Sequence, residues 1–238
     1  MSAPPLSVIL FALNEEENIA SVLGELVEWL DVHIPDAEVV FVDDGSQDGT
    51  LEAAKRALSG FRHTTRRHAR NGGIGAALKT GVRAARGDWV TFLPADGQIE
   101  PAAIDTLRDA ATPGVHVVFS VYDHRNDGLD RTVLSAGVRG LIRAVHGVTM
   151  RSDGPYLFRR SIFLPDELPP DSFFLNFELP IRALAAGLST RVVTIRCRPR
   201  QAGHSKSTGI KRIVSVAKDL ADLRRRRVTR AWSILRGR

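Results

Sequence analysis

Two adjacent carboxylates occupy a position where α/β proteins often place chemistry. Asp43 and Asp44 directly follow the apolar run Glu38–Val42 and precede Gly45 and Ser46. Like charges repel, so a turn alone explains this pair poorly, whereas a ligand with hydroxyl or N–H groups would donate hydrogen bonds to both carboxylates. The alternative is an Asx turn that begins the next helix. We favour the ligand site.

A second acidic position follows the apolar run Trp89–Leu93. Asp96 and Gln98 offer a carboxylate and a carbonyl oxygen, which suit a hard divalent cation that bridges two phosphates. Gly97 between them is also compatible with a plain turn. The pair therefore predicts a metal site only in combination with other features.

Two polar loops add further candidates. Asn71–Gly75 is rich in glycine, but a dinucleotide fingerprint needs a strand directly before its glycines, and the basic stretch Arg66–Arg70 stands there instead. We expect a loop that closes over a ligand, or a plain turn. Arg200, Ser205 and Lys206 lie in a loop with phosphate-binding groups, for which a disordered surface loop is the alternative.

Apolar runs alternate with helical patterns along the chain. Strands are expected at Leu6–Ala12, Glu38–Val42, Trp89–Leu93 and Val115–Val121. Helices are expected between them, the first one capped by Asn14. This alternation favours an α/β protein with a mostly parallel sheet covered by helices. Ligands of such sheets bind beyond the carboxyl ends of the strands, which is where the candidate residues stand.

A later helix carries Glu178 and Arg182, four residues apart. This spacing places both side chains on one helix face. Such pairs are most often exposed, so we expect a surface ion pair of small energetic value.

Composition sets the broad class. The chain has 238 residues, of which 43% are hydrophobic and 25% charged, as in soluble globular proteins, and this length fits one α/β domain. The net charge of +6 is concentrated in Arg224–Arg227 and the tail to Arg238. That indicates an anionic partner or a solvated charge run. No aromatic–basic interleaving supports nucleic acid as this partner, so none is expected.

The sequence also bears on location. Cys197 is the only cysteine, which excludes an internal disulfide and is compatible with the cytoplasm. The N-terminus lacks the features of a signal peptide, and no uncharged stretch of about 18 residues predicts a membrane span. Residues 210–238 form a basic amphipathic pattern. We expect a helix that lies on an anionic membrane surface or packs its apolar stripe on the domain.

The candidate segments together resemble family 2 glycosyltransferases, and within them the dolichol- or polyprenol-phosphate sugar (mannosyl or glucosyl) transferases. The similarity extends from about residue 6 to residue 208, and its segments keep the family's order and spacing. They are Leu13–Ile19, Val42–Thr50, Asn71–Leu78, Ala95–Gln98, Phe158–Arg160, Glu178–Arg182 and Arg200–Lys206.

The resemblance implies a GT-A fold over residues 1–209, with a nucleotide-sugar half at about 1–121 and an acceptor half at about 122–209. It implies an inverting hexosyltransferase that uses a GDP- or UDP-sugar and Mg²⁺ or Mn²⁺. The residues that it implies for the nucleotide sugar are Leu13, Glu15, Val42, Asp43, Asp44, Asp96, Arg200 and Lys206. Asp96 and Gln98 would hold the metal, one acid fewer than the family's Asp-x-Asp motif because Pro94 takes the first position.

The acceptor decides the chemistry. A lipid phosphate is already ionised near neutral pH and needs no strong base, whereas a sugar hydroxyl needs a carboxylate to take its proton. We assign Asp153 as the candidate base, Asp96 and Arg200 as further catalytic residues, and Arg125, Arg131 and Ser205 as acceptor-binding residues. A polyprenyl phosphate is the expected acceptor. With the features of location above, we expect a cytoplasmic protein, and the basic tail allows a peripheral position at the cytoplasmic membrane.

Three other functions are weighed against transfer to a lipid phosphate. Transfer to a sugar hydroxyl and non-catalytic binding of a nucleotide sugar stay open, the latter because of Pro94. A sugar-nucleotide pyrophosphorylase is disfavoured, because Glu15–Glu17 after the first strand would repel a triphosphate.

Overall fold

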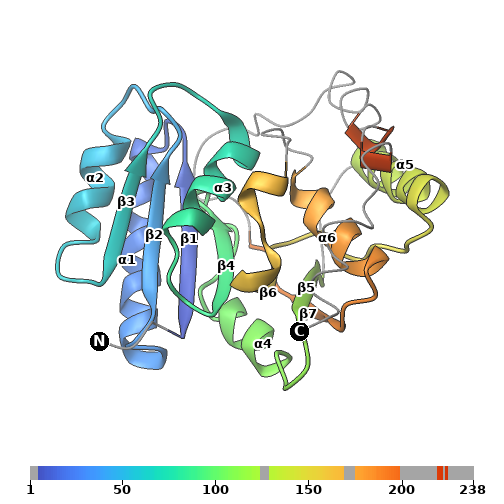
Figure 1. The fold of residues 1–238 in the computed structure, drawn as a ribbon. Coiled ribbons are helices and arrows are strands. Elements are labelled where there is room, and N and C mark those ends of the chain that lie inside the picture. The colour runs from blue at the N-terminus through green and yellow to red at the C-terminus, as the bar shows by residue number, and fades with distance from the viewer. Residues whose placement is uncertain (1–4, 124–128, 169–174, 199–218, 222, 225–238) are drawn as a thin grey trace.

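The computed structural model describes residues 5–123, 129–168, 175–198, 219–221 and 223–224 (Figure 1). Within them one sheet of seven strands has the order β3-β2-β1-β4-β6-β5-β7. The strands are β1 (Leu6–Ala12), β2 (Glu38–Asp43), β3 (His63–Arg67), β4 (Trp89–Pro94), β5 (Val117–Tyr122), β6 (Leu157–Arg159) and β7 (Thr190–Ile195). All pairs are parallel except those of β6, which runs antiparallel to β4 and β5. The predicted mostly parallel sheet is confirmed.

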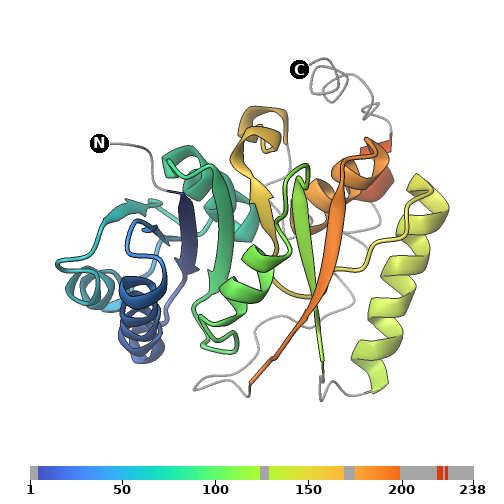
Figure 2. The ribbon, with the colours of Figure 1, turned by 90° about the horizontal axis from the view of Figure 1, so that it is seen from below.

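Helices cover both faces of this sheet (Figures 1 and 2). One face packs α1 (Glu16–His33), α2 (Thr50–Ala57) and α4 (Ala103–Asp109), and the other packs α3 (Gly73–Ala84) and α6 (Leu175–Ala185). Alternate residues of a strand pack against the two helix layers. In β1, Val8 and Leu10 face the layer of α1, α2 and α4, whereas Ile9 faces the layer of α3 and α6. Because β1 and β2 are buried on both faces, their sequences are almost continuously apolar.

The second half of the molecule adds α5 (Leu129–His146) and two short 3-10 helices, Arg160–Ile162 and Pro165–Glu167. A separate apolar cluster joins α5 to α6 through Ile142 and Ile181. No helix among the described residues is long and apolar enough to cross a bilayer.

Several local features differ from the sequence-based expectation. Three strands were not predicted from the sequence, namely β3, β6 and β7. β3 is polar and largely exposed at the sheet edge, β6 has only three residues, and most residues of β7 are exposed or half-buried. The predicted cap at Asn14 is wrong. Asn14 has φ of +52°, and its side chain accepts a hydrogen bond from the Gln47 N–H group instead (2.9 Å).

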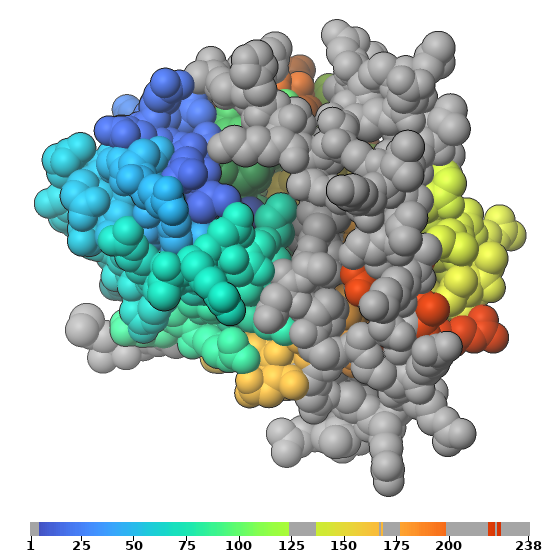
Figure 3. All heavy atoms as spheres, turned by 90° about the horizontal axis from the view of Figure 1, so that it is seen from above, coloured from blue at the N-terminus to red at the C-terminus, as the bar shows by residue number. Residues whose placement is uncertain are grey.

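The described part of the predicted C-terminal helix packs on the domain. Leu220 and Leu223 are fully buried against Ile142, Met150 and Ile181, and Figure 3 shows this segment (red) beside α5 (yellow-green). The Leu220 carbonyl lies 3.2 Å from His146 Nε2. For these two leucines the packing alternative is confirmed. The rest of 210–238 lies outside the described residues.

The burial of His146 in this packing makes the stability of the protein depend on pH. Burial, and to a lesser degree the charge of Arg224, lower the pKa of His146 below its ordinary 6.5, although the Leu220 carbonyl raises it. The unfolded chain therefore takes up a proton before the folded one, so stability falls as the pH drops below about 6.5. We predict that His146→Gln, which keeps an N–H donor for Leu220, flattens the decline of Tm between pH 7 and 5. Identical Tm profiles for the two proteins would contradict this assignment.

Candidate functional site

The strand register brings the predicted site residues to one edge of the sheet. Ala12 at the end of β1 pairs with Asp43, and Phe11 pairs with Pro94 at the end of β4. The Asp44 N–H group donates to the Ala12 carbonyl (2.9 Å). The loops after β1, β2 and β4 therefore emerge side by side, as the sequence predicted.

Asp43 is a fully buried carboxylate at this edge. Its Oδ1 accepts a hydrogen bond from the Ser46 N–H group (2.9 Å), which is the Asx turn considered from the sequence. Its Oδ2 lies 3.2 Å from Arg67 Nε, an ion pair that lacks hydrogen-bond alignment. Arg67 also donates to the Ser46 carbonyl (3.0 Å). The guanidinium thus balances a buried charge, which would otherwise be costly.

Asp44 organises the glycine loop. Its two carboxylate oxygens accept hydrogen bonds from the N–H groups of Gly72 (2.9 Å) and Gly73 (2.8 Å). His68 Nδ1 lies 2.7 Å from the same carboxylate, and the other ring nitrogen lies 2.8 Å from the Thr80 hydroxyl. Asp44 therefore ties the loop before α3 to the end of β2.

The glycine loop is a turn that leads into α3, one of the two outcomes expected for it. The expectation that only an irregular basic stretch precedes it is wrong, because β3 ends at Arg67. The loop packs closely on the Asp44–Gly45 turn: a Cβ on Gly45 would lie 2.6 Å from the carbonyl carbon of Arg70, and Gly45 has φ of +83°. A residue with a side chain would separate these two loops.

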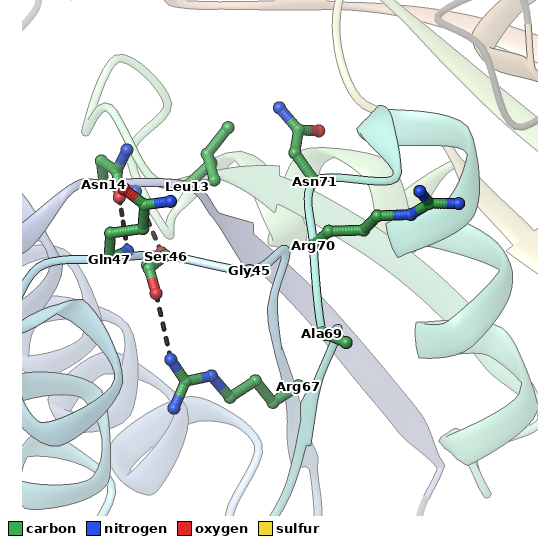
Figure 4. Close-up of a pocket in the computed structure, with 9 residues that line it drawn as sticks. All are labelled: Leu13, Asn14, Gly45, Ser46, Gln47, Arg67, Ala69, Arg70 and Asn71. Atoms are coloured by element: carbon green, nitrogen blue, oxygen red, sulfur yellow. Dashed lines mark hydrogen bonds between the residues drawn. The ribbon is translucent and has the colours of Figure 1, made fainter.

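A cleft of about 640 Å³ opens between the loops (Figure 4). It is lined by Leu13, Asn14, Gly45, Ser46, Gln47, Arg67, Ala69, Arg70 and Asn71. Leu13 was predicted to contact a ligand and lies in this wall. Arg67 and Arg70 were missed as site residues. The basic run that contains them was the available signal, but only the pairing of β3 with β2 places it at the cleft.

Of the described residues predicted for the nucleotide sugar, Leu13 lines this cleft, whereas Glu15, Val42, Asp43, Asp44 and Asp96 do not. Val42 is fully buried in the sheet, where its side chain joins the core beneath α3. The carboxylate of Glu15 accepts a hydrogen bond from Asn18 (2.9 Å) at the start of α1. Ligand contacts by these five residues stay predictions.

The predicted metal ligands lie in a tight turn after β4. The Gln98 N–H group donates to Asp96 Oδ1 (3.2 Å), and Gly97 has φ of +68°. The Gln98 side-chain amide is 3.5 Å from the Arg198 carbonyl through its Nε2, so its Oε1 is the end that can serve a cation. One carboxylate and one amide oxygen fit Mg²⁺ as a partial ligand set that substrate phosphates would complete. In the part of the chain that the structure describes, no cluster of three or more acidic, His or Cys side chains forms a metal site.

The predicted acceptor residues are only partly described. Asp153 forms an ion pair with Arg139 of α5 (2.9 Å), and its N–H group donates to the Ser120 carbonyl of β5 (2.9 Å). Arg131 lies on α5, but its side chain is not described. Arg125, Arg200, Ser205 and Lys206 lie outside the described residues.

The expected surface ion pair on α6 is instead buried. The exposed fractions of the Glu178 and Arg182 side chains are 0% and 6%, and Arg182 donates to Glu178 Oε1 from both Nε (2.9 Å) and one terminal nitrogen (2.7 Å). Glu178 Oε2 is buried without a hydrogen bond. The helical spacing was read correctly, but burial depends on packing against other elements, which spacing does not reveal.

The hydrogen bonds that Asp44 accepts from Gly72, Gly73 and His68 lead to a prediction about stability. Asp44→Ala removes the acceptor of two backbone N–H groups and of His68, and hydrogen bonds to charged groups contribute about 1.5–3 kcal/mol each. We expect the free energy of unfolding to fall by about 3 kcal/mol and the loss for Asp44→Asn, which keeps one acceptor oxygen, to be smaller. Denaturant titration measures both. Asp88 is exposed, so Asp88→Ala is the control. An equal loss of stability in Asp88→Ala would refute the stabilising role of the hydrogen bonds to Asp44.

Comparison with known sequences places the chain in a family. Residues 7–165 match the sequence model described as Glycosyl transferase family 2. The chain is 29% identical over 233 residues to the undecaprenyl-phosphate 4-deoxy-4-formamido-L-arabinose transferase of Edwardsiella ictaluri, which covers 96% of this chain and 70% of that protein. The protein of the same name from Aeromonas hydrophila is 32% identical over 66% of this chain and 49% of its own length.

Solved structures agree on the fold. Glucosyl-3-phosphoglycerate synthase from Mycobacterium tuberculosis, in complex with Mn²⁺, UDP and phosphoglyceric acid, matches with a TM-score of 0.69 and 23% identity over 95% of this chain and 79% of that one. The same enzyme with Mg²⁺ and UDP matches with a TM-score of 0.67 and 21% identity over 92% and 78% of the two chains. The GT-A fold is confirmed, and the chain belongs to glycosyl transferase family 2.

Proposed function

We propose that this glycosyltransferase moves a sugar from a nucleotide sugar to a polyprenyl phosphate. The observation that carries the proposal is the convergence of the cleft and the Asp96–Gln98 turn at the carboxyl ends of β1, β2 and β4 in a family 2 chain. The relatives whose names include undecaprenyl phosphate support a lipid-linked acceptor.

The cleft has the groups that a nucleotide requires. Leu13 supplies an apolar wall, while Asn14, Gln47 and Arg67 supply polar groups along the same cleft. Asp43 and Asp44 are the proposed acceptors for hydroxyl and N–H groups of a nucleoside, whereas Arg67 can only donate, for example to a carbonyl oxygen of the base. The donor's base and sugar follow from the resemblance only as a GDP- or UDP-sugar.

The Asp96–Gln98 turn would hold Mg²⁺ or Mn²⁺ on the diphosphate. Such a cation supplies charge neutralisation of the leaving nucleoside diphosphate when bound. Asp96 presents a carboxylate and Gln98 an amide oxygen for this purpose. We further assign Arg200 and Lys206 to the phosphates, where charge-assisted hydrogen bonds would stabilise the leaving group.

A phosphate acceptor simplifies the remaining chemistry. It is ionised near neutral pH and attacks without losing a proton to the protein. Asp153 Oδ1 is held by Arg139 (2.9 Å), so accepting a proton from a sugar hydroxyl would remove the negative charge that this ion pair stabilises. Arg125, Arg131 and Ser205 are the proposed contacts of the acceptor phosphate.

The central test is a transfer assay with polyprenyl phosphate and a panel of UDP- and GDP-sugars in the presence of Mn²⁺. We expect transfer to the lipid phosphate and a loss on the order of a hundredfold for Asp96→Ala, because one of the two proposed metal ligands is removed. Asp105→Ala, in an exposed pair on α4, is the matched control and should keep its activity. Transfer to a sugar hydroxyl but to no lipid phosphate would overturn the acceptor assignment.

Membrane attachment is a second proposed property, resting on the basic residues beyond Arg224. Because Leu220 and Leu223 are needed for packing, the test replaces Arg225, Arg226 and Arg227 with Gln. About 1 kcal/mol per basic residue predicts a drop of more than a hundredfold in binding to anionic vesicles. A variant with the exposed Arg56, Arg62 and Arg83 changed to Gln has the same net charge and should bind normally in co-sedimentation. Equal binding by both variants would refute the tail's role.

A further inference from the structure

The turn that carries Asp96 and Gln98 is held from the far end of the sheet. Arg198 follows β7, about 100 residues further along the chain. Its guanidinium donates to the Gly97 carbonyl through Nε (2.5 Å), and its N–H group donates to the Gln98 carbonyl (2.9 Å). One residue thus contacts both carbonyls of the turn.

The guanidinium is itself oriented by α1. Its two terminal nitrogens contact the two carboxylate oxygens of Glu25, one of them at 3.0 Å. Such a bidentate pair fixes the plane of the guanidinium as well as its position. Hydrogen bonding to Glu25 raises the pKa of Arg198, so the group keeps its charge.

The contacts of Arg198 bear on the conformation of the turn. Gly97 is in the left-handed region (φ of +68°), and within the turn the Gln98 N–H group donates to Asp96 Oδ1 (3.2 Å). The 3.5 Å contact of Gln98 Nε2 with the Arg198 carbonyl also directs the opposite end of the amide, Oε1, away from Arg198. Arg198 therefore acts on both the main chain and the side chain of the turn.

We propose that Arg198, oriented by Glu25, is a positioning residue that holds the Asp96–Gln98 turn in the conformation that binds the metal–diphosphate group of the donor. The metal role of the turn rests on the function proposed above. The hold on the turn itself rests only on the contacts of Arg198. Second-sphere partners of metal ligands change metal affinity by about 10- to 100-fold when removed.

A merely structural ion pair is the competing explanation. The exposed fractions of the Arg198 and Glu25 side chains are 26% and 37%, and pairs of this kind contribute little to stability. Arg83 and Asp166 form a pair of similar chemistry (2.6 Å) with exposed fractions of 51% and 88%, and Arg83 pairs there with Asp166 and not with a residue of the turn. Arg83→Met is therefore the matched control for Arg198→Met.

The first measurement is amide hydrogen exchange of residues 94–100 in the protein without nucleotide. We expect exchange to accelerate at least tenfold in Arg198→Met and less in Glu25→Gln, with no change in Arg83→Met. In the double variant Glu25→Gln/Arg198→Met, the Glu25 change should add nothing, because Glu25 acts through Arg198. Unchanged exchange in Arg198→Met, or additive effects in the double variant, would overturn the proposal.

The second measurement is binding of Mn²⁺ by the whole 238-residue chain with saturating UDP or GDP, followed by calorimetry. We expect the Mn²⁺ Kd to rise on the order of 10- to 100-fold in Arg198→Met and to stay unchanged in Arg83→Met. A loosened turn with an unchanged Mn²⁺ Kd would also overturn the positioning role. If the wild-type protein binds neither nucleotide with Mn²⁺, the proposed function fails, while the exchange experiment still decides whether Arg198 holds the turn.

Discussion

The parallel pairing of β1 with β2 and β4 is the constraint on which the site depends. Parallel strands end at the same edge of a sheet, so the loops after Ala12, Asp43 and Pro94 must emerge together. The hydrogen bond from the Asp44 N–H group to the Ala12 carbonyl extends this register by one residue (2.9 Å). A shift of one strand by one residue would turn the core side chains of both faces around, and the two helix layers that bury them make such a shift costly.

Given that edge, charge pairing decides the shape of the site. Two buried carboxylates side by side would be unfavourable if each lacked a partner. Asp43 has Arg67 from the edge strand, and Asp44 has His68 and two backbone N–H groups from the loop that follows. Asp43 and Asp44 thus hold the basic edge strand β3 and the loop after it close to the end of β2. The cleft lies beside these contacts and is lined in part by Arg67 and Arg70.

The second half of the molecule follows a different logic. There the antiparallel β6 is inserted between β4 and β5, and a buried ion pair on α6 replaces part of the apolar packing. Contacts that are distant in sequence hold this half together: Leu220 and Leu223 fill the space between α5 and α6, and Arg198 joins the end of β7 to α1 and to the turn after β4. The proposed metal turn is therefore connected to the half of the molecule assigned to the acceptor.

The sequence by itself determined the parallel α/β fold, because β1, β2 and β4 are almost continuously apolar, as strands buried on both faces must be. It also located Asp43, Asp44, Asp96 and Leu13 at strand ends, since the end of an apolar run can be read directly. Only the tertiary structure decided the partners of these residues. The polar strand β3 has no apolar pattern from which a strand could be predicted. It forms a strand because it pairs with the edge of β2. The burial of Glu178 with Arg182 and the contact of Arg198 with the turn likewise depend on elements far apart in the chain, which local patterns cannot specify.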